Sequence, residues 1–236
     1  ACAEVPRIRQ PVLRADRFQA ATPKGVRDFT NVYAEFNGSE ASNKRVVLVS
    51  HYDTKSGCGC PGANDGASTS GLLVALAGAF AKWTTPRGNL MLIWTDGEEC
   101  MEAYGANDGL WGSKQAAQML VEKKLPVQAV VCLDMIGDKD LAISIPVNGN
   151  PELTRQTLLA VQRVGLSGLV KPSEFAVLDD HVPFLRRGYP AIDLIDFDYG
   201  LRNAYWHTPQ DTMDKISVSS LLKSGKIAAE LLNILL

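Results

Sequence analysis

The chain has 236 residues, of which 46% are hydrophobic and 21% charged, a composition typical of a globular protein with a sizeable core. The formal net charge is -2 and no basic stripe is present, which argues against a nucleic-acid partner. The longest apolar runs, residues 71–80 and 231–236, are much shorter than the ~20 residues that cross a bilayer, so no membrane span is expected.

Short runs rich in Val, Ile and Leu alternate along the chain with longer segments whose apolar residues recur every three or four positions. The short runs predict strands at residues 30–36, 45–50, 90–95, 129–135, 141–146 and 191–197. The longer segments predict helices at residues 68–83, 113–124, 151–164 and 218–236. This alternation predicts an α/β fold with a mostly parallel central twisted sheet flanked by helices. No linker interrupts it, so we expect a single domain over residues 1–236.

Polar residues follow three of the predicted strands at the point where each strand ends. His51 follows the run 45–50, Glu98 and Glu99 follow 90–95, and Asp134 ends 129–135. Ligands of open α/β sheets bind outside the carboxyl ends of the strands. We therefore expect these side chains to converge on one crevice.

The polar residues near these strand ends have the chemistry of metal ligands. Imidazole and carboxylate groups without cysteine suit zinc in an open catalytic site better than a closed structural one. A single such residue is more often a hydrogen-bonded structural histidine or a solvated acid, but here several occur at successive strand ends. The sequence therefore predicts a metal site built from His51, Asp65, Glu98, Glu99, Asp134 and His207.

The adjacent acids Glu98 and Glu99 suggest a division of roles. Neighbouring residues in a loop can point in different directions, so one can bind metal while the other acts as a proton shuttle. The shuttle must stay off the metal, because coordination lowers its basicity, whereas a dry pocket raises its pKa. The alternative interpretation is a helix N-terminus whose acids complement the helix dipole.

The order of the motifs HYD, NDGAS, DGEE, LDMIG and WHTPQDT resembles the zinc aminopeptidase fold. With TPKGVRDFTN, HYDTK, DDHVPFLRRG and the Trp206-His207 pair, the chain more specifically resembles the glutaminyl-peptide cyclotransferases, in a bacterial form. Those enzymes close N-terminal glutamine into pyroglutamate with release of ammonia. The resemblance extends from about residue 21 to the C-terminus.

The resemblance implies a role for each matching residue. It implies one zinc ion held by Asp65, Glu99 and His207, with Glu98 as the proton shuttle, and His51 not bound to metal. It also implies an acidic hydrogen-bond network and an aromatic pocket for the glutamine side chain. The network would contain Asp134, Asp179 and Asp180, and Trp206 would wall the pocket. We expect Tyr104 or Phe184 to contribute to the same aromatic wall.

The chain departs from the animal enzymes of this family at several positions. Tyr104 stands where they carry a pocket tryptophan, and Ser50 and Ser70 stand where they have a disulfide near the metal. The loop at 56–63 holds Cys58 and Cys60, which lack the spacing of the usual redox and zinc motifs. We expect either a loop disulfide or free thiols there.

Two other functions remain open from the sequence. The first is an aminopeptidase with two zinc ions, in which His51 and Asp134 complete a second metal site and Glu98 activates water. The motif DDHVPFLRRG and Trp206 argue against it. The second is a non-catalytic domain that binds peptide N-termini or zinc, although such a domain has no use for a free base.

The N-terminal residues and the resemblance suggest where the protein acts and on what. The sequence begins at Ala1, and Cys2 is compatible with a bacterial lipid-attachment site or with a stray cysteine. We expect an exported protein, periplasmic or extracellular, that is a monomer and acts on peptides or proteins beginning with Gln.

Overall fold

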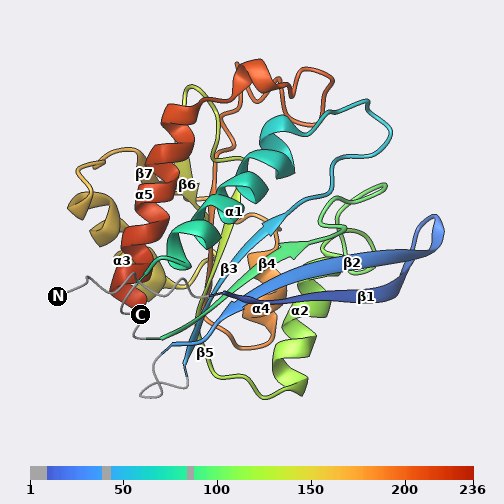
Figure 1. Cartoon of the computed structure of the whole chain (residues 1–236). Helices are drawn as coiled ribbons and strands as arrows, with labels where there is room; N and C mark the ends of the chain where they lie inside the picture. The colour runs from blue at the N-terminus through green and yellow to red at the C-terminus, as the bar shows by residue number, and fades with distance from the viewer. Residues whose placement is uncertain (1–9, 39–43, 84–87) are drawn as a thin grey trace.

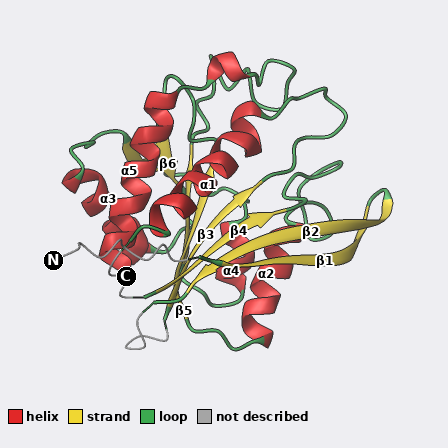
Figure 2. Ribbon diagram, viewed as in Figure 1, coloured by secondary structure: helices red, strands yellow, loops and turns green. Residues whose placement is uncertain are grey.

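The computed structural model describes residues 10–38, 44–83 and 88–236. These residues form an eight-stranded sheet with helices on both faces (Figure 1, Figure 2). The spatial order of the strands is β1-β2-β4-β3-β5-β8-β6-β7. Their bounds are β1 (Val12–Thr22), β2 (Gly25–Phe36), β3 (Arg45–His51), β4 (Asn89–Thr95), β5 (Val127–Asp134), β6 (Ile143–Ile145), β7 (Val170–Pro172) and β8 (Ala191–Ile195).

Four central strands run parallel, in the order β4, β3, β5 and β8. The β1–β2 hairpin is added antiparallel at one side, and β6 pairs antiparallel with β8 at the other. The register aligns the carboxyl ends, since His51 pairs with Thr95 and Asp134 pairs with Ile195. The predicted α/β class with a mostly parallel sheet is therefore confirmed.

Helices cover both faces of this sheet, with α1, α3 and α5 on one side and α2 and α4 on the other (Figure 1). Strand β3 shows why both faces need cover, because successive side chains of a strand point to opposite faces of the sheet. Val46 and Leu48 pack with α1 and α5, whereas Val47 and Val49 pack with α2 and α4. A strand buried on both faces reads as a continuous apolar run. The helices are α1 (Thr69–Phe80), α2 (Trp111–Glu122), α3 (Pro151–Arg163), α4 (His181–Arg186) and α5 (Val218–Leu235), with short η1 (Ala63–Ser68) and η2 (Met213–Lys215).

The structure differs from the sequence-based expectation mainly in short or exposed elements. The strand expected at 30–36 begins at Gly25 and is preceded by β1, which was not expected. The strand expected at 141–146 covers only 143–145, and that at 191–197 ends at Ile195. Strand β7 and helix α4 were also missed, because three and six residues are too few to establish a period.

No helix among the described residues is long and apolar enough to cross a membrane. Cys2, the suggested lipid-attachment residue, lies outside the described residues. That the whole chain is a single domain stays a prediction.

The double-sided burial of the sheet predicts how core substitutions affect stability. Leu92 in β4 is fully buried, whereas Leu13 in β1 is 71% exposed. Leu92→Ala should lower the free energy of unfolding by about 2–5 kcal/mol, since it removes a buried side chain and leaves a cavity. Leu13→Ala should change it by less than about 0.5 kcal/mol. Urea unfolding followed by circular dichroism measures both, and equal effects would contradict this packing.

Candidate active site

Asp65 reaches the carboxyl end of the sheet through a distorted turn before α1. Within η1, Asp65 has φ −84° and ψ 91°, and Gly66 has φ 100°, so neither residue is helical. Position 66 requires glycine, because a Cβ there would lie 2.7 Å from the carbonyl oxygen of Asp53 and 3.1 Å from the ring of His51. The close approach of this backbone to His51 brings the Asp65 carboxylate beside the imidazole.

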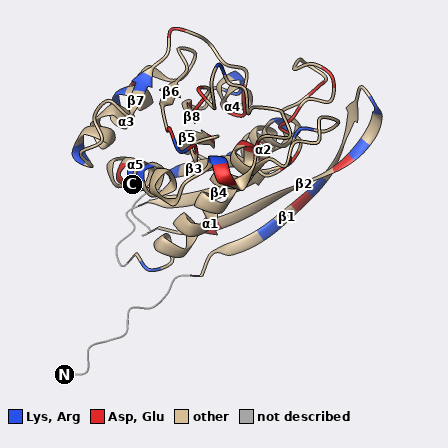
Figure 3. Cartoon of the chain, turned by 90° about the horizontal axis from the view of Figure 1, so that it is seen from above, with Lys and Arg blue, Asp and Glu red and all other residues tan. Residues whose placement is uncertain are grey.

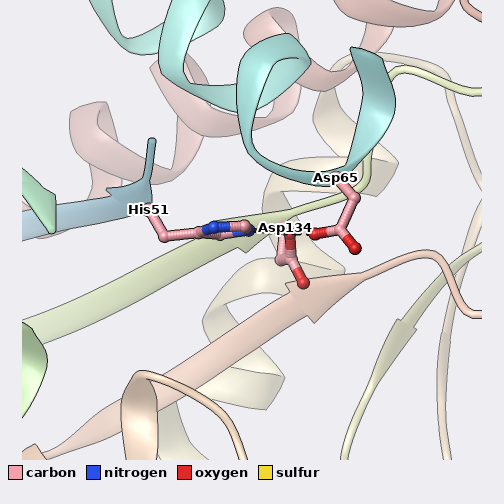
Figure 4. A group of neighbouring side chains, drawn as sticks. All are labelled: His51, Asp65 and Asp134. Carbon is pink, nitrogen blue, oxygen red and sulfur yellow. Dashed lines mark hydrogen bonds and ion pairs between the residues drawn. The ribbon is translucent and has the colours of Figure 1, made fainter. Parts of the chain in front are cut away.

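His51, Asp65 and Asp134 form a first group of potential metal ligands (Figure 4). The Nε2 atom of His51 lies 3.1 Å from Oδ1 of Asp134 and 3.2 Å from Oδ1 of Asp65. Its Nδ1 atom lies 3.2 Å from the carbonyl oxygen of Asp53. His51 and Asp134 come from the ends of β3 and β5, so the predicted convergence at the strand ends is confirmed for these two residues, and Asp65 joins them from η1.

Asp65, Glu99 and His207 form a second group, which shares Asp65 with the first. The Nε2 atom of His207 lies 2.9 Å from Oε1 of Glu99 and 3.2 Å from Oδ2 of Asp65. Asp65 therefore presents one oxygen to each histidine. His207 itself has φ 56°, an uncommon conformation for a residue other than glycine.

The charges around the second group favour a bound cation. Burial lowers the pKa of His207, but hydrogen bonds and charge from Asp65 and Glu99 raise it to about 9. The carboxylates thus stabilise positive charge at this position. Oδ2 of Asp65 is buried and lies 3.2 Å from Nε2 of His207, and the ligand atoms of the group lie within 4.8 Å of one another. One nitrogen and two carboxylate donors at this spacing fit a divalent metal ion.

Glu98 is buried beside this group, and its carboxylate makes a hydrogen bond to a tyrosine. The Tyr104 hydroxyl donates to Oε2 of Glu98 at 3.0 Å and lies 3.1 Å from Oε2 of Glu99. Burial, followed by the negative charge of Asp179, raises the pKa of Glu98 well above its ordinary value. This environment favours the protonated form of the carboxyl group, so Glu98 has the character of a proton donor as well as of a base.

A cavity of about 300 Å³ opens onto these carboxylates. The Trp206 ring stacks on His207 with centroids 3.8 Å apart, and it meets the Phe197 ring edge-on at 5.4 Å. Phe197 was not anticipated from the sequence. Polar groups thus line one part of the cavity and aromatic groups another; its lining residues are Asp65, Glu98, Tyr104, Asp134, Ala176, Val177, Leu178, Asp179, Phe197, Trp206 and His207.

The remaining predicted residues take different positions. Asp179 lines the cavity, and burial with the charge of Asp134 raises its pKa to about 8. Asp180 lies outside the cavity lining, accepts a hydrogen bond from the Thr95 hydroxyl at 2.6 Å, and has its pKa raised to about 7 by burial and by Asp179. Phe184 requires a correction: its side chain is fully buried in the core under α2 rather than in the cavity, because it faces the sheet from α4.

Two carboxylates that the sequence analysis did not single out fix the backbone of the site. Asp53 accepts hydrogen bonds from the amides of Glu98 and Glu99, both at 3.1 Å. Asp211 accepts from the amides of Asn64 at 2.7 Å and Asp65 at 3.2 Å. Both acids lie within the motifs HYD and WHTPQDT, so the motifs contained the signal.

The positions noted as departures are also settled in the structure. Ser50 and Ser70 lie side by side with their hydroxyl oxygens 3.4 Å apart. Cys58 and Cys60 are both free thiols rather than a loop disulfide. The Cys60 thiol faces Oδ2 of Asp211 at 3.7 Å.

Comparison with known proteins places the chain in a family. The model of peptidase family M28 matches residues 31–232, so the chain belongs to that family. Within it the chain resembles the glutaminyl cyclases. A solved structure of an Acidobacteriales bacterium glutaminyl cyclase is 34% identical, with a TM-score of 0.88 and coverage of 94% of this chain and 79% of that one.

Two further similar proteins are a cyclotransferase-like protein and a peptidase. The mouse glutaminyl-peptide cyclotransferase-like protein is 32% identical over 91% of this chain, which spans 62% of the mouse protein. A leucine aminopeptidase precursor from Bacteroides thetaiotaomicron shares the fold, with a TM-score of 0.83 at 20% identity and coverage of 94% and 82% of the two chains. Cyclases and peptidases thus share this architecture.

The role of Asp211 as a backbone anchor predicts its effect on metal binding. Asp211→Ala removes the acceptor of the Asn64 and Asp65 amides, so the Asp65 carboxylate should lose its fixed position. Divalent-metal affinity should fall by about 10–100-fold, as is usual for the loss of a group that supports a ligand. Competition with a chromogenic chelator measures it, with exposed Asp214→Ala as the control. Equal affinities in the two variants would contradict the anchoring role.

Proposed function

We propose that this chain is a zinc-dependent glutaminyl-peptide cyclotransferase, which converts the N-terminal glutamine of peptides to pyroglutamate and releases ammonia. The observation that carries the proposal is the buried Glu98 carboxylate beside the Asp65–Glu99–His207 group, in one cavity with Trp206. The names of the relatives support the same activity.

In this proposal Asp65, Glu99 and His207 would hold a single zinc ion. Zinc is the metal that carboxylate and imidazole ligands favour in an open catalytic site. When bound, it supplies Lewis-acid polarisation of the γ-carboxamide carbonyl of the substrate. Proton transfer, binding of the α-amine and positioning of the substrate are assigned to side chains of this protein.

Glu98 takes the proton from the α-amine of the substrate as that amine attacks the γ-carbonyl carbon. The same carboxyl group then delivers the proton to the departing ammonia, so Glu98 ends the cycle unchanged. Burial raises the pKa of Glu98, which makes the carboxylate a stronger base for the first transfer and leaves the carboxyl group able to donate in the second. The hydrogen bond from Tyr104 holds the carboxylate in one orientation.

Asp134 and Asp179, which line the cavity, bind the α-amine through their carboxyl oxygens. Asp180 is a positioning residue: its backbone amide donates a hydrogen bond to Oδ1 of Asp179 and so orients the Asp179 carboxyl group. Trp206 and Phe197 form the aromatic wall that holds the side chain of glutamine folded onto its own amine. Because the reaction is intramolecular, holding this conformer provides much of the rate enhancement.

A second candidate function is a two-zinc aminopeptidase that removes N-terminal residues. It is favoured by the shared Asp65, which offers one oxygen to the His51 group and the other to the His207 group. In that reaction Glu98 would activate a water molecule against the first peptide bond. The metal content distinguishes the two functions.

We expect one tightly held zinc ion per chain in protein purified without added metal. His51→Ala should leave that content unchanged, because His51 is not among the three proposed ligands, whereas His207→Ala should lose the zinc. Elemental analysis by mass spectrometry measures both variants. Two zinc ions per chain, together with a large loss of activity in His51→Ala, would favour the aminopeptidase.

Glu98→Gln preserves the shape of the side chain and removes the base. Turnover of a Gln-initiated peptide should fall by at least ~10²-fold while the zinc content stays unchanged. Glu99→Gln should lose zinc as well as activity. Exposed Glu102→Gln is the matched control and should keep both. Near-normal turnover in Glu98→Gln would show that the assigned proton transfer is wrong.

The aromatic wall predicts a particular kinetic effect and a side-chain preference. Trp206→Ala should lower kcat more than it raises KM, because the wall holds the attacking conformer. Exposed Leu201→Ala serves as the control. Asn-initiated peptides should not react, since they would have to close a strained four-membered ring. Steady-state assays of released ammonia test both points, and a pure KM effect in Trp206→Ala would contradict the role of the wall.

We propose that the protein is exported to the periplasm or the extracellular space and acts there, as a monomer, on peptides and proteins that begin with Gln. Fractionation of cells expressing the full-length gene, followed by immunoblotting, tests the location. Recovery of the protein only in the cytoplasm would contradict it.

A further inference from the structure

A second cavity, of about 280 Å³, lies where α2 meets α4 and shares no lining residue with the candidate active site. Its lining residues are Lys114 of α2 and Pro183, Arg186 and Arg187 from α4 and its C-terminal end. The two helices lie next to each other on the same side of the sheet (Figure 1, Figure 3). The arginines belong to the motif DDHVPFLRRG, whose acids are used in the proposed active site but whose basic residues are not.

The positive charges around this cavity have no matching negative charge in its lining. No carboxylate lines it, and within the described part of the chain the guanidinium groups of Arg186 and Arg187 make no hydrogen bond or ion pair. Burial and the nearby charge of Arg186 lower the pKa of Lys114, which reflects the repulsion. The acid that opposes this effect is Asp108, whose carboxylate accepts hydrogen bonds from the amides of Met101, Glu102 and Ala103.

The donors of the cavity are divided between the lysine and the arginines. The Lys114 amine already donates to the carbonyl oxygens of Gly105, Ala106 and Gly109, at 3.3, 3.1 and 2.8 Å. The Lys114 ammonium group therefore contributes positive charge to the cavity, but its N–H donors already have acceptors. The two guanidinium groups supply planar forks of N–H donors, which match the oxygen spacing of a phosphate, sulfate or carboxylate.

We propose that the Lys114–Arg186–Arg187 cavity binds an oxyanion of the size of phosphate or sulfate. Such an anion would neutralise the clustered charges and satisfy N–H groups that have no other acceptor among the described residues. The oxyanion that the two guanidinium groups bind is either a free inorganic anion or the carboxylate of an acidic peptide.

Isothermal titration calorimetry of the metal-loaded protein with sodium phosphate, at constant ionic strength, tests the proposal. The double variant Arg186→Gln, Arg187→Gln should bind phosphate at least about tenfold more weakly than the wild type, because it loses the charge-assisted hydrogen bonds. Arg27→Gln, an exposed arginine on β2, is the matched control and should bind like the wild type. Both variants should unfold at the same temperature as the wild type without phosphate, since the substituted side chains are exposed.

Two results would overturn the proposal. One is the absence of phosphate binding to the wild type, and the other is unchanged affinity in the double variant, which would assign the anion to another position such as the metal centre. Titration with the blocked dipeptide acetyl-Asp-Glu-amide, against acetyl-Asn-Gln-amide, distinguishes the source of the oxyanion. Acidic-dipeptide binding that the double variant loses identifies a peptide carboxylate, and phosphate binding alone identifies a free anion.

Discussion

Repulsion between buried carboxyl groups at the carboxyl end of the sheet is the constraint on which the site depends. Each group is largely withdrawn from water; they are Asp65, Glu98, Glu99, Asp134, Asp179 and Asp180. Such a cluster is stable only if protons or a cation offset its charge. The raised pKa values of Asp179 and Asp180 and the positive charge favoured on His207 are two expressions of this requirement. A divalent cation is a third way to meet it.

The fold holds these groups together despite the repulsion because their backbones are fixed independently of their side chains. Parallel β3, β4, β5 and β8 end at one edge, and helices bury both faces of the sheet. Asp53 and Asp211 then tie the segments that carry Glu98, Glu99 and Asp65 through hydrogen bonds from backbone amides. These hydrogen bonds fix the backbone that carries Asp65 and Glu99, two of the three proposed metal-binding side chains.

The elements that the sequence predicted correctly are those with strong local patterns of apolar residues. The apolar runs of β3 and β5 are long and buried on both faces, so their strand character and the polar residues at their ends were readable. Strand β1 was missed because its residues are exposed or only half-buried, and so it lacks a buried apolar face. Helix α4 has six residues and contains Pro183, which leaves no period from which to assign its buried face. This is why Phe184 was wrongly assigned to the pocket.

The anchoring residues escaped prediction for a different reason. Asp211 lies within a recognised motif, but it accepts hydrogen bonds from the backbone amides of Asn64 and Asp65, and such bonds leave no pairing of side chains in the sequence from which the role could be assigned. Phe197 was missed likewise, since only the folded chain brings its ring against Trp206. Whether Arg186 and Arg187 are paired depends likewise on the folded chain, and neither side chain forms an ion pair with any residue that the structure describes.

The most direct test of the proposed activity is product analysis by mass spectrometry. The protein is incubated with a Gln-initiated peptide and, separately, with a Leu-initiated peptide of otherwise identical sequence. Cyclisation predicts that the first peptide loses ammonia while retaining every residue, and that the second peptide is unchanged. Release of free leucine from the second peptide, with no loss of ammonia from the first, would contradict the account and identify a peptidase.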